Sequence, residues 1–417
     1  MFKPRLLYTL ALYLLLPFIP LRLLWRGRKQ PAYLRHWGER FGWYSAVPQA
    51  PLIWIHAVSV GETRACVPLI AALQARFPAH KILLTHMTPT GRETGRTLFG
   101  TRVLQTYLPY DLPGATQRFL SHFKPSFGLL METELWPNLI AACRQRHIPL
   151  ALINARLSER SARGYARLAA LARAALQNLT LICAQTSADA ERLTQLGAHH
   201  VVVTGNIKFD VVPPPANDQL RKLFGAERQV ILAASTRDGE EALLLDALST
   251  PIPNQLLLIV PRHPQRFDAV ATLLASRRIA FQRRSENAPI RAETQVVLGD
   301  SMGEMFAYYG AADVAIIGGS LLPFGGQNLI EACALGVPVI LGPHTHNFAQ
   351  AAQDAVNGGA ALRVADAGAA LAQAQALLQD HEKRKSMRAA ALRFAAEHRG
   401  AVDKTMKLIE EKLLKTH

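Results

Sequence analysis

The stretch LLMETELWPN (129–138) joins an apolar run to two carboxylates and a proline. The residues before Glu132 are typical of a buried β-strand, and Pro137 suits the first turn of a helix. Residues two apart in an extended chain point to the same side, so Glu132 and Glu134 are expected on one face. One of them could instead cap the following helix. The stretch predicts a buried strand that ends in a polar site before a helix.

The same alternation of short apolar runs with helical patterns recurs beyond residue 50. Near-continuous apolar strands between helices indicate parallel sheets that helices cover on both faces. The sequence therefore predicts an α/β fold with doubly wound, Rossmann-like domains. Strands are expected at 52–57, 81–87, 103–108, 127–132, 149–155, 179–185 and 201–205 in the first half, and at 230–235, 256–261, 295–300, 314–319 and 338–343 in the second.

The stretch DVVPPPAND (210–218) separates the two halves. Three consecutive prolines can neither extend a central strand nor continue a helix, so this stretch is interpreted as a linker. A chain of 417 residues also suits two domains of roughly 200 residues each. We expect an N-terminal segment at 1–30, one domain at 31–212 and a second at 213–417, with a cleft between the domains. Ligands of such sheets bind beyond the carboxyl ends of the strands.

The N-terminal stretch LLYTLALYLLLPFIPL (6–21) contains no charged residue but is interrupted by Pro17 and Pro20. It is shorter than the roughly 20 apolar residues that a spanning helix needs. No small-residue cleavage site follows, as a signal peptide would require. A short membrane anchor, an amphipathic segment in the lipid headgroup layer and a buried helix of the first domain remain open. Membrane association is our prediction, with arginines after the stretch keeping the body cytoplasmic.

The composition limits the class of partner. Lys and Arg total 47 against 31 Asp and Glu, a net charge of +16, which favours an anionic partner such as a lipid surface or a phosphorylated substrate. No RNA-recognition signature, zinc-finger spacing or long basic block occurs, so nucleic acid is not expected. Four widely spaced cysteines without a C-x-x-C pair indicate reduced core thiols.

Two polar clusters of the first half follow predicted strands or precede the linker. Glu62 in VSVGET comes after the strand at 52–57 and begins a helical pattern, where the helix dipole is expected to lower its pKa and keep it ionised. Such a carboxylate could act as a general base, or it could simply cap the helix. Lys208 in GNIKFD (205–210) could reach a phosphate or a developing negative charge, or be a solvated surface lysine.

The second half carries polar loops after its strands. In AASTRDGEE (233–241), Ser235 or Thr236 is expected to cap a helix whose backbone amides could bind an anion. Arg262 and His263 lie between two prolines in IVPRHPQRF (259–267), where a guanidinium suits bidentate phosphate binding.

Two further stretches of the second half follow predicted strands and offer groups that could bind a ligand. Glu304 in GDSMGEM (299–305) could accept hydrogen bonds from ribose hydroxyls. Two Gly-Gly pairs in 316–343 let the backbone approach a ligand before a helix that carries Glu331, a candidate for bonding a sugar ring.

Several motif classes are missing from the sequence. There is no D-x-D, no H-E-x-x-H and no Cys/His cluster, so a metal-held pyrophosphate is not expected. There is also no Walker loop, which argues against P-loop ATPases. Helix dipoles, Arg262 and Lys208 would then neutralise a leaving phosphate.

Taken in order, the motifs resemble one enzyme family. HAVSVGE, MTPTGRE, YLPYDLP, METELWPN, NARLS, GNIKFD, STRDGEE, PRHPQRF, GDSMGEM and GGSLLPFGGQNLIEA are similar to the 3-deoxy-D-manno-octulosonic acid (Kdo) transferases of lipid A and lipopolysaccharide assembly. The resemblance implies a metal-independent, inverting glycosyltransferase with the two-domain GT-B fold. It also implies transfer of Kdo from CMP-Kdo to the tetra-acylated lipid A precursor, lipid IVA, at the cytoplasmic face of the inner membrane, with anionic lipids as partners and no cofactor.

The resemblance also implies roles for single residues. Glu62 would be the general base, and Glu132 and Lys208 would stabilise the transition state, leaving Glu134 to brace the loop. The family commonly has His and Pro where this chain has Gln327 and Leu329, and the Gln327 side chain can still donate a hydrogen bond. CMP would be held by Pro261, Arg262, Met302, Gly303, Glu304, Asn328, Leu329, Ile330 and Glu331.

The sequence also leaves open a role for three arginines and two alternative functions. Arg64, Arg92 and Arg96 follow first-domain strands and could meet acceptor phosphates. The chain could instead be another GT-B nucleotide-sugar enzyme, such as a UDP-sugar transferase or a 2-epimerase. A non-catalytic membrane scaffold that binds anionic lipid is a third hypothesis, although the motif residues of a transferase are intact.

Overall fold

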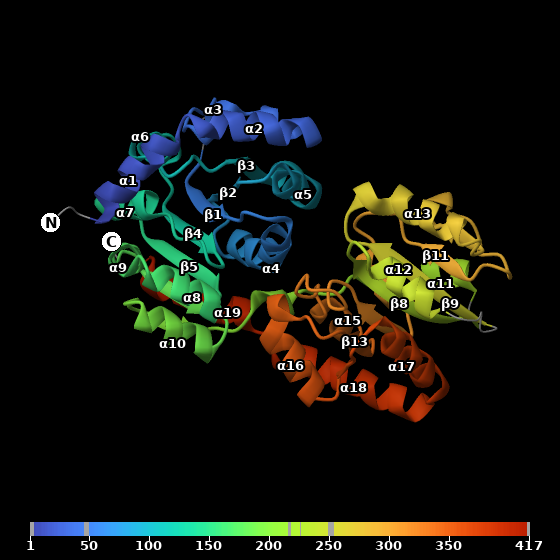
Figure 1. Cartoon of the computed structure of the whole chain (residues 1–417). Helices are drawn as coiled ribbons and strands as arrows, with labels where there is room; N and C mark the ends of the chain where they lie inside the picture. The colour runs from blue at the N-terminus through green and yellow to red at the C-terminus, as the bar shows by residue number, and fades with distance from the viewer. Residues whose placement is uncertain (1–3, 46–49, 216–217, 226, 249–253, 415–417) are drawn as a thin grey trace. The chain divides into compact units, whose positions relative to one another are not determined.

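The computed structural model describes residues 4–45, 50–215, 218–225, 227–248 and 254–414 (Figure 1). The chain divides into two compact units. Unit 1 comprises Met1–Val211 together with Arg399–His417, and unit 2 comprises Val212–His398. Each unit is built on one parallel seven-stranded sheet.

The sheet of unit 1 has the strand order β3-β2-β1-β4-β5-β6-β7. Its strands are β1 (Leu52–His56), β2 (Lys81–His86), β3 (Val103–Tyr107), β4 (Phe127–Met131), β5 (Leu150–Ala155), β6 (Leu181–Ala184) and β7 (Val201–Val203). The central strands β1 and β4 pair in parallel, with Ile53 opposite Phe127. From β1 the chain first builds one side of the sheet and then, from β4, the other. The gap between the ends of β1 and β4 is therefore the topological switch point.

The helices of unit 1 cover both faces of this sheet (Figure 1). They are α1 (Pro4–Leu15), α2 (Phe18–Lys29), α3 (Trp37–Arg40), α4 (Val60–Arg76), α5 (Pro89–Phe99), α6 (Pro113–Phe123), α7 (Pro137–Gln145), α8 (Glu159–Ala166), α9 (Ala169–Gln177), α10 (Ser187–Gln195) and α19 (Ala401–Lys412), with 3-10 turns η1 (Pro31–Leu34), η2 (Gly100–Arg102) and η3 (Ile207–Asp210).

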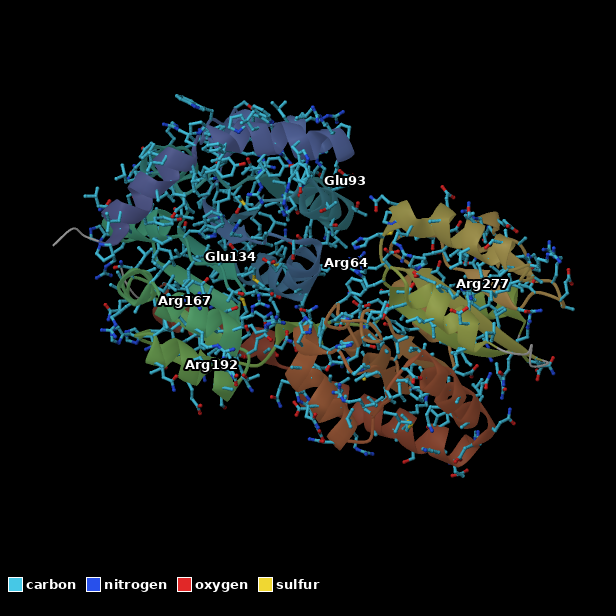
Figure 2. The ribbon with its side chains drawn as sticks, viewed as in Figure 1. Arg64, Glu93, Glu134, Arg167, Arg192 and Arg277 are labelled. Atoms are coloured by element: carbon cyan, nitrogen blue, oxygen red, sulfur yellow. The ribbon has the colours of Figure 1, made fainter. Side chains whose placement is uncertain are left out.

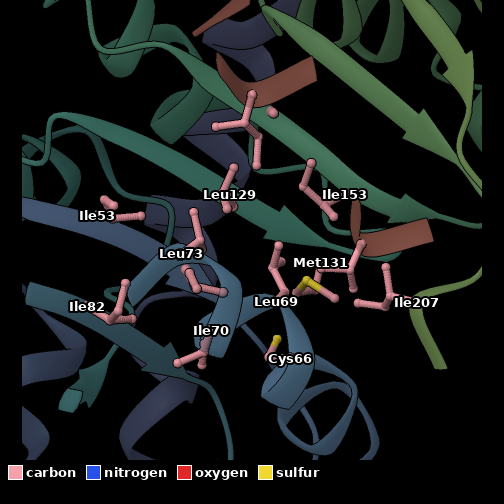
Figure 3. Close-up of a cluster of buried hydrophobic side chains, with 14 of the residues drawn as sticks. Ile53, Cys66, Leu69, Ile70, Leu73, Ile82, Leu129, Met131, Ile153 and Ile207 are labelled. Atoms are coloured by element: carbon pink, nitrogen blue, oxygen red, sulfur yellow. The ribbon is translucent and has the colours of Figure 1, made fainter. Parts of the chain in front are cut away.

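The core of unit 1 follows the two-residue alternation of its strands. Ile53 and Ile55 of β1 belong to one buried cluster, and Leu52 and Trp54 belong to the cluster on the opposite face. Figure 3 shows the first cluster, where side chains of the strands meet Leu69 and its neighbours on α4. Burial on both faces explains why the strands read as continuous apolar runs.

Unit 2 repeats the design with the strand order β10-β11-β9-β8-β12-β13-β14. Its strands are β8 (Gln229–Thr236), β9 (Gln255–Pro261), β10 (Phe281–Arg283), β11 (Val296–Leu298), β12 (Val314–Ile317), β13 (Val339–Leu341) and β14 (Ala361–Arg363). Its helices are α11 (Gln219–Phe224), α12 (Glu240–Ala247), α13 (Phe267–Ser276), α14 (Met305–Ala311), α15 (Ile330–Ala334), α16 (Ala349–Asn357), α17 (Ala367–Gln379) and α18 (His381–Glu397), with 3-10 turns η4 (Pro264–Arg266), η5 (Arg284–Glu286) and η6 (His346–Phe348). The switch point lies between β8 and β12.

All the expected strands form, and the structure adds β10 and β14. Both additions are three-residue strands at the two edges of the second sheet. Their sequences, FQR and ALR, are not continuous apolar runs, so the pattern of the sequence does not reveal them.

The C-terminal segment differs from the expected division of the chain. Residues 399–417 were assigned to the second domain, but they belong to unit 1. Val402, Met406 and Ile409 of α19 belong to the same buried cluster as Leu69 of α4. The carboxylate of Asp210 accepts hydrogen bonds from the backbone N–H groups of Gly400 and Val402, each 2.6 Å long. The chain therefore passes from one unit to the other twice, once near residue 211 and once near residue 399.

The N-terminal helices lie on the surface of unit 1. Helix α1 has no buried residue, so the expectation of a buried core helix for this segment is wrong. Among the described residues, no single helix is long and apolar enough to cross a membrane, but α1 and α2 together meet that test by length and composition, with a bend of 55° between them.

Candidate active site

The two acidic stretches of unit 1 lie at its switch point. Glu62 follows β1 at the start of α4, and Glu132 directly follows β4. Because β1 and β4 are parallel neighbours, both residues emerge at the same edge of the sheet. This edge, with Glu62, Glu132, Glu134 and Lys208, is called the acidic edge below.

Glu62 lies in the first turn of α4 and is 8% exposed. Its Oε2 accepts a hydrogen bond from the backbone N–H of Val58 at 2.8 Å, and its Oε1 accepts one from the Ser59 hydroxyl at 2.8 Å. Ser59 in turn caps α4 by accepting from the N–H of Glu62. The cap of α4 is therefore Ser59 and not Glu62, and the bonds from Val58 and Ser59 hold the Glu62 carboxylate in one orientation.

The ionisation of Glu62 differs from the prediction. Burial, followed by the charge of Glu132, raises its pKa to about 7 against the lowering effect of the bonds from Val58 and Ser59. The expectation that the helix N-terminus keeps Glu62 at a low pKa is wrong, because loss of hydration outweighs the dipole in this position. A carboxylate with a pKa near 7 is well suited to take up a proton at neutral pH.

Glu132 adopts an unusual backbone conformation and pairs with Lys208. Its φ of 59° lies in the left-handed region, so the chain turns directly after β4. Its Oε1 accepts a hydrogen bond from Nζ of Lys208 at 2.7 Å, with both side chains about four-fifths buried. Lys208 is therefore a partner of the acidic edge and not a solvated surface lysine.

Two asparagines position Lys208. Asn154 lies at an irregularity in the pairing of β5 and has a φ of 55°, and its Oδ1 accepts from the N–H of Ile207 at 3.1 Å. Asn206 Oδ1 accepts from the N–H of Lys208 at 3.0 Å. Asn154 and Asn206 thus hold the backbone that carries Lys208. The sequence analysis gave neither residue a role, and only the position of Asn154 at the end of a strand could have indicated one.

Glu134 also reaches the acidic edge, from the opposite side of a turn. Burial raises its pKa, the charge of Glu132 adds to that, and the Trp136 side chain opposes it. The charge of Glu134 acts on Glu62 less than that of Glu132 does. The two carboxylates are close because the chain turns between them, not because a strand continues past Met131. Figure 2 labels Glu134 within unit 1.

Two buried histidines next to this edge are structural. The ring of His56 contacts the Thr85 hydroxyl at 2.9 Å, and burial lowers its pKa to about 3. His86 lies between the carbonyl of Ala57 and the side chain of Gln105, and burial lowers its pKa to about 4. Both rings are neutral at physiological pH, so neither adds a positive charge to the acidic edge.

The polar loops of unit 2 meet at its own switch point, between β8 and β12. The carboxylate of Glu240 is fully buried and accepts from the backbone N–H groups of Arg237, Gly319 and Leu321. Gly318 allows this close approach, since a side chain there would lie 2.5 Å from the carbonyl of Ser235. One carboxylate thus fastens the loop after β8 to the loop after β12.

Helix α12 begins differently from the prediction. Neither Ser235 nor Thr236 caps it, because β8 continues through both residues and Gly239 is the N-cap. The Thr236 hydroxyl donates to buried Glu241, which also receives both amino groups of the Arg266 guanidinium. The conformation of this loop is therefore fixed by buried ion pairing.

Arg262 directly follows β9 and faces the glycine-rich loop. Its N–H donates to the carbonyl of Thr236 at 2.9 Å, and its Nε donates to Oε1 of Gln327 at 3.2 Å. Next to it, Arg237 contacts Nε2 of His263 at 3.1 Å. Burial, and then the positive charges of Arg262 and Arg237, lower the pKa of His263. This edge is cationic and suits an anionic group.

Residues 302–304 form a turn before α14. Met302 is exposed and Gly303 has a φ of 86°, with open space around the position of a side chain. Glu304 accepts from Arg284 at 2.9 Å. The side chain of Glu304 is therefore held in place while the backbone of the turn stays accessible.

The stretch 328–331 combines core and polar positions. Leu329 and Ile330 are buried, so only their backbone could contact a nucleotide, and the same holds for buried Pro261. Asn328 donates to Glu331 at 3.1 Å and accepts from the N–H of Ile330 at 3.0 Å. Helix α15 has five residues, which makes the expected contribution of its dipole small.

Of the three arginines considered for acceptor phosphates, Arg92 has internal partners. Its guanidinium forms a bidentate pair with Glu39, with distances of 2.7 and 3.2 Å, and is nearly buried. Arg96 is exposed and lies 3.8 Å from Glu93. Arg64 is partly exposed on α4 (Figure 2). Only the last two remain candidates.

The last groups to consider are the cysteines and the side chains that could bind a metal ion. All four cysteines are buried and unpaired, as expected. Within the described ranges, no group of three or more His, Cys, Asp and Glu side chains is arranged to hold a metal ion.

Solved structures with low sequence identity share the fold. A glycosyltransferase from Rickettsia africae covers 89% of this chain and 100% of that chain with a TM-score of 0.59 at 15% identity. The UDP-GlcNAc 2-epimerase of Neisseria meningitidis bound to UDP-GlcNAc covers 88% and 100% with a TM-score of 0.58 at 17% identity. At these identities the likeness shows the two-domain GT-B fold alone.

Sequence comparison is more specific. The family model described as 3-Deoxy-D-manno-octulosonic-acid transferase (kdotransferase) matches residues 35–211, and the model described as Glycosyl transferases group 1 matches residues 275–394. The 3-deoxy-D-manno-octulosonic acid transferase of Bordetella pertussis is 46% identical over 97% of this chain and 98% of its own length. That of Haemophilus influenzae is 40% identical over the same shares. The chain therefore belongs to the 3-deoxy-D-manno-octulosonic acid transferase family of glycosyltransferases.

Proposed function

We propose that this Kdo transferase uses CMP-Kdo as donor and lipid IVA as acceptor, with inversion at the anomeric carbon and without a metal ion. The observation that carries the proposal is the acidic edge, where a buried carboxylate with a pKa near 7 lies beside an ion pair. This edge belongs to the part of the chain that the Kdo-transferase family model matches.

Glu62 is the general base in this proposal. Its carboxylate accepts the proton of an acceptor hydroxyl as the oxygen attacks the anomeric carbon of Kdo, and the bond from that carbon to the CMP phosphate breaks. Attack from the side opposite to the leaving group inverts the configuration. The bonds from Val58 and Ser59 hold the carboxylate, so little reorganisation is needed when the proton arrives.

Glu132 and Lys208 stabilise the charges that develop. The anomeric carbon becomes positive as the CMP phosphate departs, and a carboxylate nearby favours that charge. The ammonium of Lys208 compensates Glu132 in the resting enzyme and is available to the negative charge on the departing group. In this proposal Glu132 stabilises the positive charge at the anomeric carbon, and Lys208 stabilises the negative charge on the departing phosphate.

Unit 2 holds the donor. Arg262 is the candidate ligand for the CMP phosphate, because Gln327 and the backbone of Thr236 fix its orientation beside Arg237 and His263. The backbone at Met302 and Gly303, the Glu304 carboxylate and the Asn328–Glu331 pair would bind ribose and base. Guanidinium groups can neutralise a single phosphate, so no metal ion is required for departure of CMP.

The acceptor and the location are connected. A tetra-acylated acceptor resides in a membrane, and unit 1 carries an exposed apolar N-terminal surface with arginines. We place the enzyme at the cytoplasmic face of the inner membrane, in contact with anionic lipids, and we assign no nucleic-acid partner.

The test is an incubation of the purified full chain with CMP-Kdo and detergent-dispersed lipid IVA, in the presence of a chelator. We expect a product whose mass exceeds that of the acceptor by one or more Kdo residues. NMR should show that the anomeric configuration of the transferred Kdo is opposite to its configuration in CMP-Kdo. Turnover of a UDP-sugar in place of CMP-Kdo, or loss of all product with the chelator, would contradict the proposal.

A further inference from the structure

Helix α8 carries arginines along one face. Arg160, Arg163 and Arg167 are separated by three and four residues, so their side chains leave the same side of the helix. Arg167 directly follows α8 with a helical φ of −67°, and its N–H group donates to the carbonyl of Gly164 at 3.3 Å. All three arginines are exposed. The surface made by Arg160, Arg163, Gly164 and Arg167 is called the arginine face.

The arginine face has no negative partner among the described residues. None of its three guanidinium groups forms an ion pair or a side-chain hydrogen bond there. Glu159 precedes Arg163 by four residues, a spacing that favours an ion pair within a helix. Its carboxylate lies instead 3.7 Å from the guanidinium of Arg192, which Figure 2 labels together with Arg167. Three positive charges are therefore left without a counter-ion in this part of unit 1.

The local sequence of α8 does not favour a helix. Like charges three and four residues apart destabilise a helix, and so does a glycine within it. Gly164 lies between Arg160 and Arg167 on the same face, and a side chain there would meet no neighbouring atom within 4 Å. The three guanidinium groups can therefore approach one anion above Gly164. Local rules that are broken on one face of one helix indicate that this face has a function.

The opposite face of α8 is attached to the acidic edge. Ala162 and Tyr165 pack against a buried cluster of unit 1. The Tyr165 hydroxyl donates to the carbonyl of Thr133 at 3.3 Å, in the turn between Glu132 and Glu134. Helix α8 also follows β5, the neighbour of β4, so it begins at the same edge of the sheet as Glu132. The arginine face is thus separated from the acidic edge by the width of one helix, about 10 Å.

The chemistry of the arginine face suits a phosphate ester. Guanidinium groups bind phosphate through paired N–H groups and stay charged at physiological pH. A phosphate monoester has a charge of about −1.5 to −2 near pH 7, which three arginines can neutralise. Leu168, 61% exposed, is the one large exposed apolar side chain within residues 156–173. A single leucine provides no apolar face for insertion into a bilayer, so one phosphorylated molecule fits this surface better than a lipid surface does.

We propose that the arginine face binds a phosphate group of the acceptor, held by Arg160, Arg163 and Arg167 above Gly164. The proposal rests on the phosphorylated lipid acceptor of the proposed function. It deepens that function by naming the residues that recognise the phosphate. These arginines hold the acceptor, and the transfer of Kdo takes place at the acidic edge.

Binding of the acceptor can be measured without turnover. Radiolabelled lipid IVA in a non-ionic detergent is titrated onto the immobilised full chain without CMP-Kdo, beside lipid IVA from which the phosphates have been removed. Arg163→Glu is expected to weaken binding of lipid IVA by about tenfold or more and to leave binding of the dephosphorylated lipid unchanged. Arg144→Glu, at an exposed position in the last turn of α7, is the control and should bind both lipids as the parent does. Equal losses for both lipids, or no loss, would overturn the proposal.

Gly164 offers a test that leaves every arginine in place. Gly164→Ala should bind lipid IVA as the parent does, because alanine favours the helix and its methyl group meets no neighbour. Gly164→Glu places a carboxylate among the guanidinium groups and should weaken binding by about tenfold. Both variants should unfold at or above the temperature of the parent, which separates a loss of binding from a loss of fold. Binding of lipid IVA by Gly164→Glu at the level of the parent would show that the phosphate is held elsewhere.

Co-flotation with phosphatidylglycerol vesicles distinguishes the acceptor from the bilayer as the source of the phosphate. We expect Arg163→Glu to float as the parent does. A loss of flotation with unchanged binding of lipid IVA would assign the arginine face to the bilayer and contradict the proposal.

Kinetics separate this inference from the proposed function. Arg163→Glu and Gly164→Glu should raise the KM for lipid IVA and leave the KM for CMP-Kdo unchanged. A parent chain that binds lipid IVA through its phosphates but transfers no Kdo would refute the proposed function and leave the inference standing. A parent chain that transfers Kdo, with an unchanged KM for lipid IVA in both variants, would do the reverse.

Discussion

Oε1 of Glu132 lies 2.7 Å from Nζ of Lys208, and this pair stands beside the buried carboxylate of Glu62. Lys208 compensates one carboxylate but not two. The remaining negative potential is part of the reason that Glu62 holds its proton to about pH 7, although burial is the larger cause. Glu132, 70 residues away in the chain, thus helps to raise the pKa of Glu62 to a value that suits proton uptake.

The variant Glu62→Gln is expected to lower kcat by about 10²–10⁴ with little change in the KM for CMP-Kdo. The amide keeps the shape of the side chain and can still accept from Val58, so the first turn of α4 remains intact. Steady-state kinetics with both substrates varied measures the effect. A kcat within threefold of the parent would show that another group takes the proton.

The same variant is expected to be more stable at alkaline pH. The folded pKa of Glu62 is raised from 4.5 to about 7, so its contribution to stability is fully present below about pH 4.5 and is lost as the pH rises through 7. Above pH 7 this loss amounts to about 3 kcal/mol. Urea unfolding at pH 5 and pH 8 should show a gain for Glu62→Gln that is larger at pH 8.

The pH profile of kcat/KM reports the same group. Activity should fall below about pH 7, with a limiting slope of tenfold per pH unit, as Glu62 becomes protonated. Glu132→Gln should shift this acid limb to lower pH, because the charge of Glu132 is the second-largest cause of the raised pKa. Glu134→Gln is the matched control, with a smaller shift, since its charge acts last among the causes. An equal or larger shift for Glu134→Gln would reverse the roles given to the two residues.

Gln327 is expected to position Arg262. Gln327→Ala removes the acceptor of the Arg262 Nε bond, so the KM for CMP-Kdo should rise roughly five- to tenfold, about 1 kcal/mol, with a smaller change in kcat. Gln327→His restores a possible acceptor and should recover much of the loss. Arg262→Lys should raise the KM more than either, because an ammonium cannot reproduce the fork of the guanidinium. An unchanged KM for Gln327→Ala would rule out this positioning role.

Asp210 is expected to anchor the C-terminal helix to unit 1. Asp210→Ala removes the acceptor of two backbone N–H groups at the start of α19, which should cost about 1–2 kcal/mol of unfolding free energy. Urea unfolding of the full chain measures this loss. Asp238→Ala, at an exposed position in unit 2, serves as the control. Equal midpoints for the two variants would show that α19 is held by its apolar side chains alone.

Much of the fold and part of the site could be predicted from local patterns. The stretch 129–138 shows why: strand β4 is buried on both faces, so its residues had to be apolar, and the first polar residue after it had to lie at the edge of the sheet. The same reasoning located Glu62, Lys208 and Arg262. The edge strands β10 and β14 lacked this signal because their residues, FQR and ALR, do not form a continuous apolar run.

The properties of the site residues depended on residues far away in the chain. The helix N-terminus predicted a low pKa for Glu62, but burial against the rest of unit 1 and the charge of Glu132 gave the opposite result. Ser235 and Thr236 had the composition of a cap, but β8 extended through them because its partner β9 continued to Pro261. Neither neighbour is visible in a local window of sequence.

The sequence by itself determined two parallel α/β units, the strand ends at which polar residues gather, and the family to which those motifs point, since burial and strand alternation leave a periodic record in the chain. Only the tertiary structure decided that α19 returns to unit 1, that Asn154 and Asn206 hold Lys208 against Glu132, and that Tyr8 and Thr9 dock α1 on Asp111 and Asn138. These are contacts between side chains distant in sequence, and their energies depend on distance and burial, which no local pattern records.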